Sequence, residues 1–398
     1  MRSRLFALVP FCLLAGLDDA SAANAGVAGR EEAIPIVLSP SRLPQPFNES
    51  PSPVTVLDRE TIRASGARKI GDLLRLVPGM VVGSIDGAYQ TVAYHGLSDE
   101  FSRRIQVRID GRSIYNPADG SAWWLNQPLQ IDNIERIEVI RGPSAASYGS
   151  NAMMATINIE TRHASEVRGM AAVIGEGSEG EADRSLRWGG AWGAGDVFIA
   201  VSQQRDEGFD DVVDRREDRG LFMRADYPLN RHDELQVELG VSRNDYRIGD
   251  SSDPRSRITE PLRTAHRDTD FQFVRWLRKV SAAEEFSLRL ARTRNENRDR
   301  DVAFSAWTAD GSGAPVFRDL TIDRSYAATR HDLEFEHRKS PGPDLDLVWG
   351  AGYRQDDVDG AAYTRDPATQ DEESWRMFGR FAWDFAPRWI LNAGLTAE

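Results

Sequence analysis

The C-terminal part of the chain alternates hydrophobic and polar positions over many short stretches. In residues 235–242, leucine and valine occupy the odd positions, and polar residues or glycine occupy the even ones. The same period of two recurs in residues 345–353 and 375–385. Because successive side chains of a strand point to opposite faces, this pattern predicts strands with one apolar face. Eleven strands are predicted, at residues 166–175, 182–192, 197–204, 219–227, 235–243, 269–278, 286–294, 325–338, 345–354, 374–385 and 389–396.

The connections between these strands alternate between short and long. The short ones are 193–196, 228–234, 279–285, 339–344 and 386–388, and the long polar ones are 205–218, 243–268, 295–324 and 355–373. Outer-membrane barrels have short turns on one side of the membrane and long loops on the other. Aromatic residues near strand ends fit the interfacial girdles of such barrels; they are Trp188, Trp192, Tyr227, Trp276, Tyr353 and Trp389. The pattern therefore favours an antiparallel membrane β-barrel over a secreted β-sandwich.

One predicted strand carries apolar residues on both faces. Phe271 and Phe273 are out of phase with Val274 and Trp276. An extra residue in one strand shifts this phase, so we expect a β-bulge here.

The N-terminus has the features of an export signal. Residues 5–17 are mostly apolar, two arginines precede them, and Ala20-Ser21-Ala22 forms a small-residue cleavage signature. This apolar run is too short for a spanning helix and predicts a secretory signal peptide at residues 1–22. An exported chain without spanning helices can cross a membrane only as a closed barrel. Six prolines between residues 35 and 53 then predict an extended linker at residues 23–53.

Residues 54–163 predict a small mixed α/β domain. Asp58 can cap a short helix, and residues 70–77 carry apolar side chains at helical spacing. Asp110-Gly111 lies between two alternating runs, which indicates a hairpin turn. The last piece of the domain is RIEVIRGPSAASYGSNAMMATINIETR (136–162), in which two strand-like runs enclose a middle rich in glycine, serine and alanine.

Candidate chemistry is sparse. The formal charge of −13 argues against nucleic acid as a partner, since phosphate binding relies on clustered Lys and Arg. Cys12 is the only cysteine and lies in the signal peptide, so the mature chain forms no disulfide. Residues 175–180 match G-x-G-x-x-G, but no helix is predicted after them, so we interpret them as a loop. His331 and His337 fit the interfacial ends of a lipid-facing strand. No nucleophile, base and orienting group occur together; we expect no enzyme, no cofactor and no metal site.

Several motifs resemble the plug domain of TonB-dependent outer-membrane receptors. They are GDLLRLVPGM, QVRIDGRSIYNP and IDNIERIEVIRGPSAASYGSNAMMATINIETR, and they occur in the family's order within residues 33–163. The resemblance implies a plug at residues 54–163 inside a barrel that has about 22 strands when complete. Residues 164–398 would supply about eleven of these strands, which is a partial barrel. An odd strand count is foreign to single-chain bacterial barrels, so we expect a truncated barrel with 389–396 as a bare edge.

The resemblance also implies roles for individual residues. Ile34, Pro35, Ile36, Val37 and Leu38 stand where the family carries its TonB box, a segment that pairs as a strand with a periplasmic energy-transducing protein. Pro35 departs from the usual pattern. The residues expected to hold the plug's turns and charges are Asp110, Gly111, Arg136, Glu138, Arg141, Gly142, Pro143 and Gly149. Candidate ligand contacts, for which plain packing is the alternative, are Tyr94, His95, Trp123 and Trp124.

The function implied is active import across the outer membrane of a Gram-negative bacterium. The solute would be a siderophore, a corrinoid or other metal chelate, or an oligosaccharide, and the expected partners are a TonB-type protein and outer-membrane lipid. The expected receptor is monomeric. The alternatives are a passive porin-like channel, which needs neither plug nor box, and a barrel for surface adhesion.

Overall fold

A computed structural model of the protein describes residues 36–38, 42, 44–46, 50–87, 89–97, 101–178, 180–210, 213–249, 262–300, 302–309, 311–360, 370–386 and 389–398. These residues belong to one compact unit, Pro35–Glu398. The predicted signal peptide at residues 1–22 lies outside the described residues.

The mixed α/β part is built around a five-stranded sheet with the strand order β3-β10-β11-β6-β7. Strand β11 runs parallel to β6, and the other neighbours are antiparallel. Its strands are β3 (Val54–Asp58), β6 (Ile105–Ile109), β7 (Arg112–Ser113), β10 (Ile134–Arg141) and β11 (Ala155–Thr161). The sheet forms because its strands carry branched apolar residues, and Ile137, Val139 and Ile157 are fully buried.

Short helices and hairpins surround this sheet. The helices are α1 (Arg59–Ala64), α2 (Ala145–Tyr148) and the 3-10 helices η2 (Ile70–Leu76), η3 (Trp124–Asn126), η4 (Ile131–Asn133) and η5 (Ala164–Glu166). The paired short strands are β1 (Ile36–Leu38) with β2 (Pro44–Pro46), β4 (Met80–Asp86) with β5 (Tyr89–Tyr94), and β8 (Tyr115–Asn116) with β9 (Ser121–Ala122). Asp58 caps α1 as predicted, accepting a hydrogen bond from the backbone N–H of Thr61 (2.8 Å). Among the described residues, no helix is long and apolar enough to cross a membrane.

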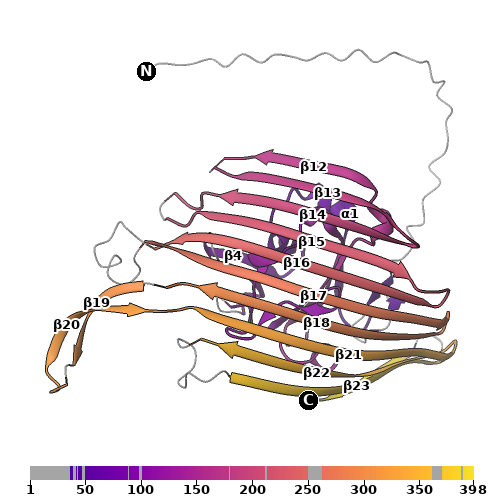
Figure 1. Cartoon of the computed structure of the whole chain (residues 1–398). Coiled ribbons are helices and arrows are strands. Elements are labelled where there is room, and N and C mark those ends of the chain that lie inside the picture. The colour runs from indigo at the N-terminus through magenta and orange to yellow at the C-terminus, as the bar shows by residue number, and fades with distance from the viewer. Residues whose placement is uncertain are drawn as a thin grey trace, which may run out of the picture. The chain divides into compact units, whose positions relative to one another are not determined.

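The C-terminal part forms one large antiparallel sheet that curves around the smaller sheet (Figure 1). Each strand pairs with the next strand of the sheet along the chain, β18 being followed by β21, and β12 and β24 are the two edges. The strands are β12 (Gly169–Glu176), β13 (Ala182–Trp192), β14 (Gly195–Asp206), β15 (Arg216–Pro228), β16 (Asp233–Ile248), β17 (Arg263–Ser281), β18 (Glu284–Arg298), β21 (Tyr326–Gly342), β22 (Leu345–Asp359), β23 (Gln370–Ala386) and β24 (Trp389–Ala397). The prediction of eleven strands is confirmed for the described part of the chain.

The structure differs from the sequence prediction in two places. First, the connection 295–324, predicted as a loop, contains a separate hairpin, β19 (Val302–Ala309) with β20 (Pro315–Ile322). Second, the bulge expected at residues 271–276 is wrong, because the pairing of β17 with both β16 and β18 is unbroken there; the register shift in β17 lies later, between Lys279 and Ser281. Both faces of β17 are apolar for separate reasons: Phe271 and Phe273 are buried against the smaller domain, whereas Val274 faces outward.

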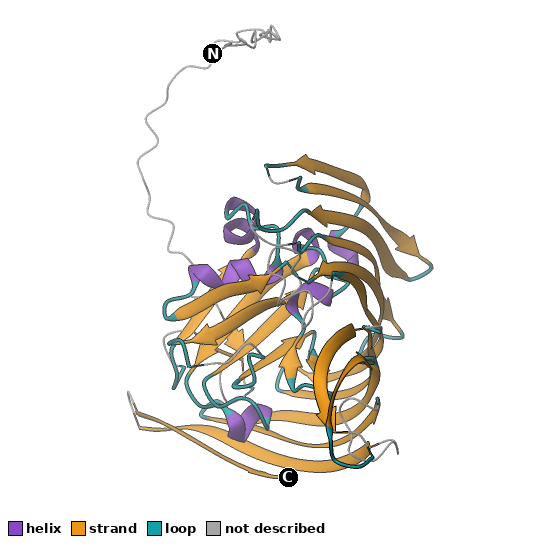
Figure 2. Cartoon of the chain, turned by 90° about the vertical axis from the view of Figure 1, so that its left-hand side faces the viewer, coloured by secondary structure: helices purple, strands orange, loops and turns teal. Residues whose placement is uncertain are grey.

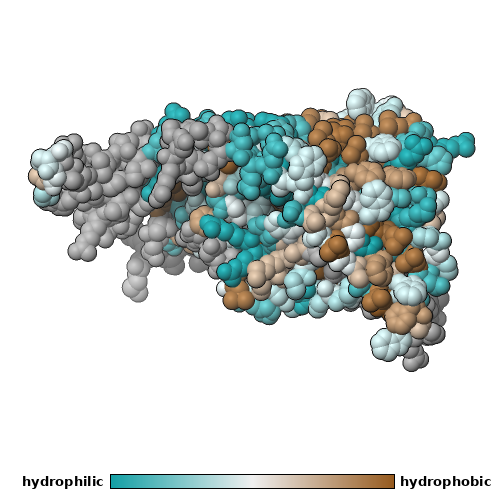
Figure 3. Space-filling view, turned by 90° about the horizontal axis from the view of Figure 1, so that it is seen from below, coloured by the Kyte–Doolittle hydropathy of each residue, from teal (hydrophilic) through white to brown (hydrophobic). Residues whose placement is uncertain are grey.

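The two faces of the large sheet differ in their surroundings. Its concave face covers the α/β domain, which contributes most of the helices seen in Figure 2. Its convex face carries exposed large apolar side chains, among them Leu186, Ile199, Leu221, Leu239, Leu290, Leu333 and Trp349. The view from the β24 side shows apolar side chains gathered in a patch, with hydrophilic ones beyond it (Figure 3). An apolar outer band over a filled interior is the arrangement of a plugged membrane barrel.

Candidate functional site

The α/β domain and the inner wall of the large sheet share one apolar core. Phe198, Phe222, Phe271 and Phe273 point inward from the sheet and join the buried residues of the small domain in a single cluster. The rings of Phe198 and Phe222 lie 5.6 Å apart, and those of Phe222 and Phe271 6.3 Å apart. A plug that packs this way is held in the lumen by apolar burial as well as by charge.

A buried carboxylate on β21 collects arginines from both parts of the chain. Glu334 is 8% exposed and accepts hydrogen bonds from Arg42 (2.8 Å) and Arg108 (3.5 Å), which come from the N-terminal segment and the plug. Arg289 and Arg376 from the wall donate to the same carboxylate. Burial lowers the pKa of Arg108 to about 9, and the three neighbouring guanidinium groups act in the same direction. The cluster therefore brings several positive charges close together, and its stability depends on the carboxylate that they share.

The neighbouring Glu336 completes the cluster around Arg42. It is 2% exposed and accepts from Arg42 (2.9 Å), Arg289 (3.2 Å) and Arg338 (2.7 Å). The Arg42 guanidinium also lies over the ring of Phe378, 4.5 Å from its centroid. Arg42 is thus fixed by two carboxylates and an aromatic face of the wall.

A second buried cluster holds the Asp110-Gly111 turn. Both residues have positive φ, 50° and 91°, as the predicted hairpin turn requires. Arg224 on β15 donates to Thr161 of the plug (3.0 Å to its carbonyl oxygen) and pairs with Asp226 (2.9 Å). Asp110 lies 3.6 Å from the same guanidinium. A Cβ at Gly111 would approach the Arg289 side chain to 2.6 Å, so the turn sits directly against the wall.

At the ends of the strands near the long loops, a third set of contacts ties the plug to the wall. Asp214, in the connection between β14 and β15, accepts a hydrogen bond from the backbone N–H of Gly87 at the tip of the β4–β5 hairpin (2.8 Å). Burial raises the pKa of the Asp214 carboxyl group. Lys69 pairs with Asp206 at 3.0 Å. These contacts place the tip of the plug hairpin under the loop that follows β14.

The residues predicted to shape the last piece of the plug lie in and around β10, α2 and β11. Arg136 pairs with Glu138 (3.0 Å) and Glu160 (2.9 Å), so these charges form fixed ion pairs within the plug. The backbone N–H of Arg141 donates to the carbonyl oxygen of Pro53 (2.9 Å), which continues the pairing of β10 with the segment before β3.

The two glycines of this piece have left-handed backbone conformations. Gly142 has φ 104° and precedes the exposed Pro143, and Gly149 caps α2 with φ 79° and ψ −158°, a region open almost only to glycine. Side chains of Arg376 and Glu398 would lie 2.6 and 2.7 Å from a Cβ at Gly149. Because these are the ends of flexible side chains that can move aside, the backbone conformation is the main reason for glycine at position 149.

The four candidate ligand contacts are separated into two pairs. Trp123 and Trp124 are 7% and 4% exposed, and Trp123 packs edge-on against Tyr326 with ring centroids 6.1 Å apart. Tyr94 and His95 are in ring contact with centroids 4.1 Å apart, at the end of the β4–β5 hairpin away from the tip that contacts Asp214. The tryptophans pack in the interior, whereas His95 is exposed. For all four, a role in ligand contact stays a prediction.

The TonB-box-like segment is described only in part. Ile34 and Pro35 lie outside the described residues. Ile36–Leu38 form β1 and pair with Pro44–Pro46, so that Val37 is opposite Gln45. Two of the three β2 residues are prolines without a backbone N–H, so this ladder offers few hydrogen bonds.

Arg42, Glu334 and Glu336 are not among the residues predicted from the sequence. A signal is nevertheless present, because in residues 331–337 the histidines and apolar residues form one face and Asp332, Glu334 and Glu336 form the other. The prediction for this strand concerns only its outward face. In a barrel wide enough to hold a plug, the inward face is polar and is expected to pair with charges of the plug.

Comparisons with known proteins agree with this geometry. Residues 46–156 match the model of the TonB-dependent Receptor Plug Domain family. The Vitamin B12 transporter BtuB of Photobacterium profundum is 33% identical over 174 residues, which cover 44% of this chain and 27% of that protein. The Iron-regulated outer membrane virulence protein of Vibrio cholerae is 29% identical over 232 residues, 53% of this chain and 34% of that protein. The chain thus matches only about a third or less of these relatives' length.

Solved structures show the same fold. A mutant form of the ferric enterobactin receptor PfeA of Pseudomonas aeruginosa superposes with a TM-score of 0.67 at 13% identity, covering 91% of this chain and 59% of that one. The receptor Fiu of E. coli K12 gives 0.67 at 16% identity, covering 90% and 61%. A plug sheet enclosed by a curved antiparallel wall defines the class of plugged outer-membrane barrels. Within that class, residues 46–156 match the plug-domain family of TonB-dependent receptors, and the chain is similar to outer-membrane transport receptors.

Proposed function

We propose that the receptor imports a scarce metal-bound solute, a ferric siderophore or a corrinoid, with energy from a TonB-type periplasmic protein. The names of the relatives support this class of solute, since one is a vitamin B12 transporter and another an iron-regulated outer-membrane protein. The plug supports gated rather than free passage, because it fills the concave side of the wall with a continuous apolar core.

The observation that carries the proposal is the position of Arg42. It follows β1 by four residues, is 3% exposed and donates to Glu334 and Glu336 of the wall. Glu334 also accepts from Arg108 of the plug. A pull on β1 would therefore reach, within a few residues, a carboxylate that the plug and the wall share. A passive channel or an adhesin needs no such connection between an N-terminal segment and the lumen.

Uptake by cells tests this function. Cells that express the full receptor should take up radiolabelled cobalamin or one of a panel of ferric siderophores, and uptake should stop when the TonB-type protein is deleted. Oligosaccharides serve as the comparison class. Uptake that continues without the partner would indicate a passive channel, and binding without uptake of any probe would indicate a surface receptor.

Replacing Arg42 with glutamine should release the N-terminal segment from the wall. Arg42 makes hydrogen bonds to two carboxylates, each charge-assisted bond being worth about 1.5–3 kcal/mol. We therefore expect at least about a tenfold rise in the mobile fraction of a spin label at position 38. Arg75→Gln, at an exposed arginine paired with Asp72 (3.5 Å), is the matched control. An unchanged spectrum of the Arg42 variant would show that this residue does not hold the segment.

A further inference from the structure

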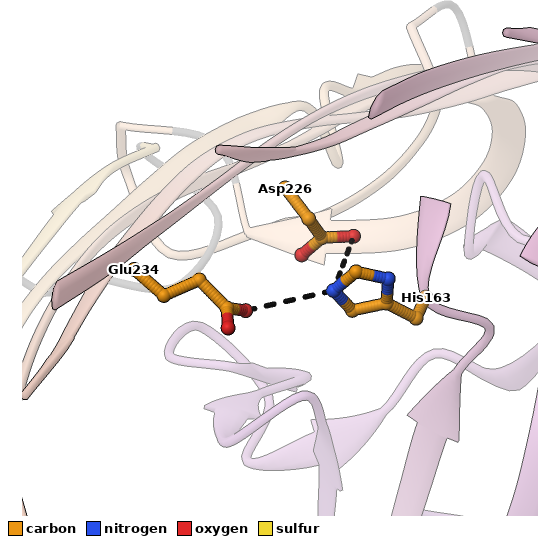
Figure 4. Close-up of side chains that lie close together, drawn as sticks. All are labelled: His163, Asp226 and Glu234. Carbon is orange, nitrogen blue, oxygen red and sulfur yellow. Dashed lines mark ion pairs between the residues drawn. The ribbon is translucent and has the colours of Figure 1, made fainter. Parts of the chain in front are cut away.

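Three potential metal ligands meet where the plug connects to the wall. His163 directly precedes η5, in the link between β11 and β12, whereas Asp226 and Glu234 flank the short turn between β15 and β16. All three side chains point to one spot (Figure 4). These residues are far apart in the sequence, so no spacing motif could have indicated them.

The distances between the ligand atoms fit a shared cation. His163 Nε2 lies 3.7 Å from Asp226 Oδ2 and 3.6 Å from Glu234 Oε1. Both distances are too long for a good hydrogen bond. Ligands bound to Zn²⁺ at about 2.1 Å in a tetrahedral arrangement lie roughly 3.4 Å from one another. The two distances from His163 Nε2 are therefore close to that spacing, and all three ligand atoms lie within 4.8 Å of one another.

Neighbouring groups orient two of the three ligands. Asp226 Oδ2 accepts from the backbone N–H of Ala164 (2.7 Å) and from Arg224 Nε (2.9 Å). His163 Nδ1 accepts from the backbone N–H of Ser165 (3.2 Å) and lies 2.7 Å from the Ser165 hydroxyl oxygen. A cation bound at Nε2 would shift the ring proton to Nδ1, where this hydroxyl oxygen can accept it. Such outer contacts are typical of metal-binding histidines and carboxylates.

The local charge allows a cation at this spot. Arg224 is balanced by Asp110 (3.6 Å) and Glu238 (4.0 Å) in addition to Asp226. Within the described part of the chain, the ion pair of Glu234 is with His163, not with a lysine or arginine. A divalent cation here would be offset by the carboxylates of Asp226 and Glu234.

Solvent and ions can reach the cluster. The side chains of His163 and Glu234 are 39% and 34% exposed, whereas that of Asp226 is 1% exposed. His163 also lines a cavity of about 350 Å³ between plug and wall. Water in this cavity can fill the fourth position of a tetrahedral cation.

We propose that His163, Asp226 and Glu234 bind a divalent first-row transition metal, with Zn²⁺ the best match to one imidazole and two carboxylates. A bound ion would tie the link between plug and wall to β15 and β16.

Metal titration of the purified, tag-free full receptor in detergent tests the site. Calorimetry with Zn²⁺ alone should give one ion per chain, and Co²⁺ alone should give the visible absorption of four- or five-coordinate cobalt. His163→Ala and Glu234→Gln should each weaken Zn²⁺ binding at least about tenfold, a loss typical of removing a ligand or its support. Glu166→Gln changes an exposed carboxylate of η5, the 3-10 helix that follows His163, and this variant should bind Zn²⁺ like the wild type. The proposal would be overturned if the wild type bound no stoichiometric Zn²⁺. It would also be overturned if a variant with both His163→Ala and Glu234→Gln still bound Zn²⁺ as the wild type does.

Discussion

Glu334→Gln is expected to loosen the plug more than any other single change to a charged residue. Glu334 is the acceptor shared by Arg42, Arg108, Arg289 and Arg376, and it is buried. Removing one partner of a buried ion pair leaves uncompensated charge and costs about 3–5 kcal/mol. Here the neutral amide would leave Glu336 as the remaining carboxylate bonded to Arg42 and Arg289, and an amide N–H group would face the guanidinium groups as a second donor.

The measurement is the leak of a bulky antibiotic through the barrel. We expect sensitivity to vancomycin to rise in cells that carry the Glu334 variant, together with faster proteolysis of the plug in isolated membranes. Glu285→Gln on β18 is the control, because Glu285 is half-buried and pairs with Arg338 at 3.7 Å. Equal sensitivity at equal protein levels would show that apolar packing alone retains the plug.

The strands were predictable because each face of the wall has a uniform environment. Period-two alternation marked strands such as β16, β22 and β23, and the Asp110-Gly111 turn carried its own signal in the residue types. The bulge in β17 was predicted wrongly because both faces of this strand meet apolar surroundings. Phe271 and Phe273 face the plug core while Val274 faces outward, so alternation is lost although the strand is regular at these residues. Only the tertiary partner explains the second apolar face.

The site was less predictable than the fold because its contacts span large sequence separations. Arg42 and Glu334 are 292 residues apart, and neither residue type is unusual in its own segment. His163, Asp226 and Glu234 come from a link and two strand ends, which meet only when the plug occupies the lumen. By contrast, Gly149 was predictable from local sequence alone, since its left-handed conformation is a property of one short turn.

Deleting residues 34–38 should abolish uptake and leave solute binding intact. The segment contributes β1, which among the described residues pairs with the proline-containing β2 and not with a strand of the wall. Because Pro44 and Pro46 lack backbone donors, β1 is held by few hydrogen bonds and can exchange to a strand of the partner. Arg42 and its carboxylates stay in place after the deletion, so the plug should remain closed.

A pair of point variants separates backbone pairing from side-chain contacts. Val37→Pro removes a backbone N–H from the centre of β1, whereas Val37→Ala keeps it. If the partner adds β1 to its own sheet, uptake should fall to the background level in the proline variant and stay near the wild-type rate in the alanine variant. Surface binding of the solute should be equal in both. Equal losses of uptake would point to a side-chain contact at Val37, and unchanged uptake in the deletion would rule out coupling through this segment.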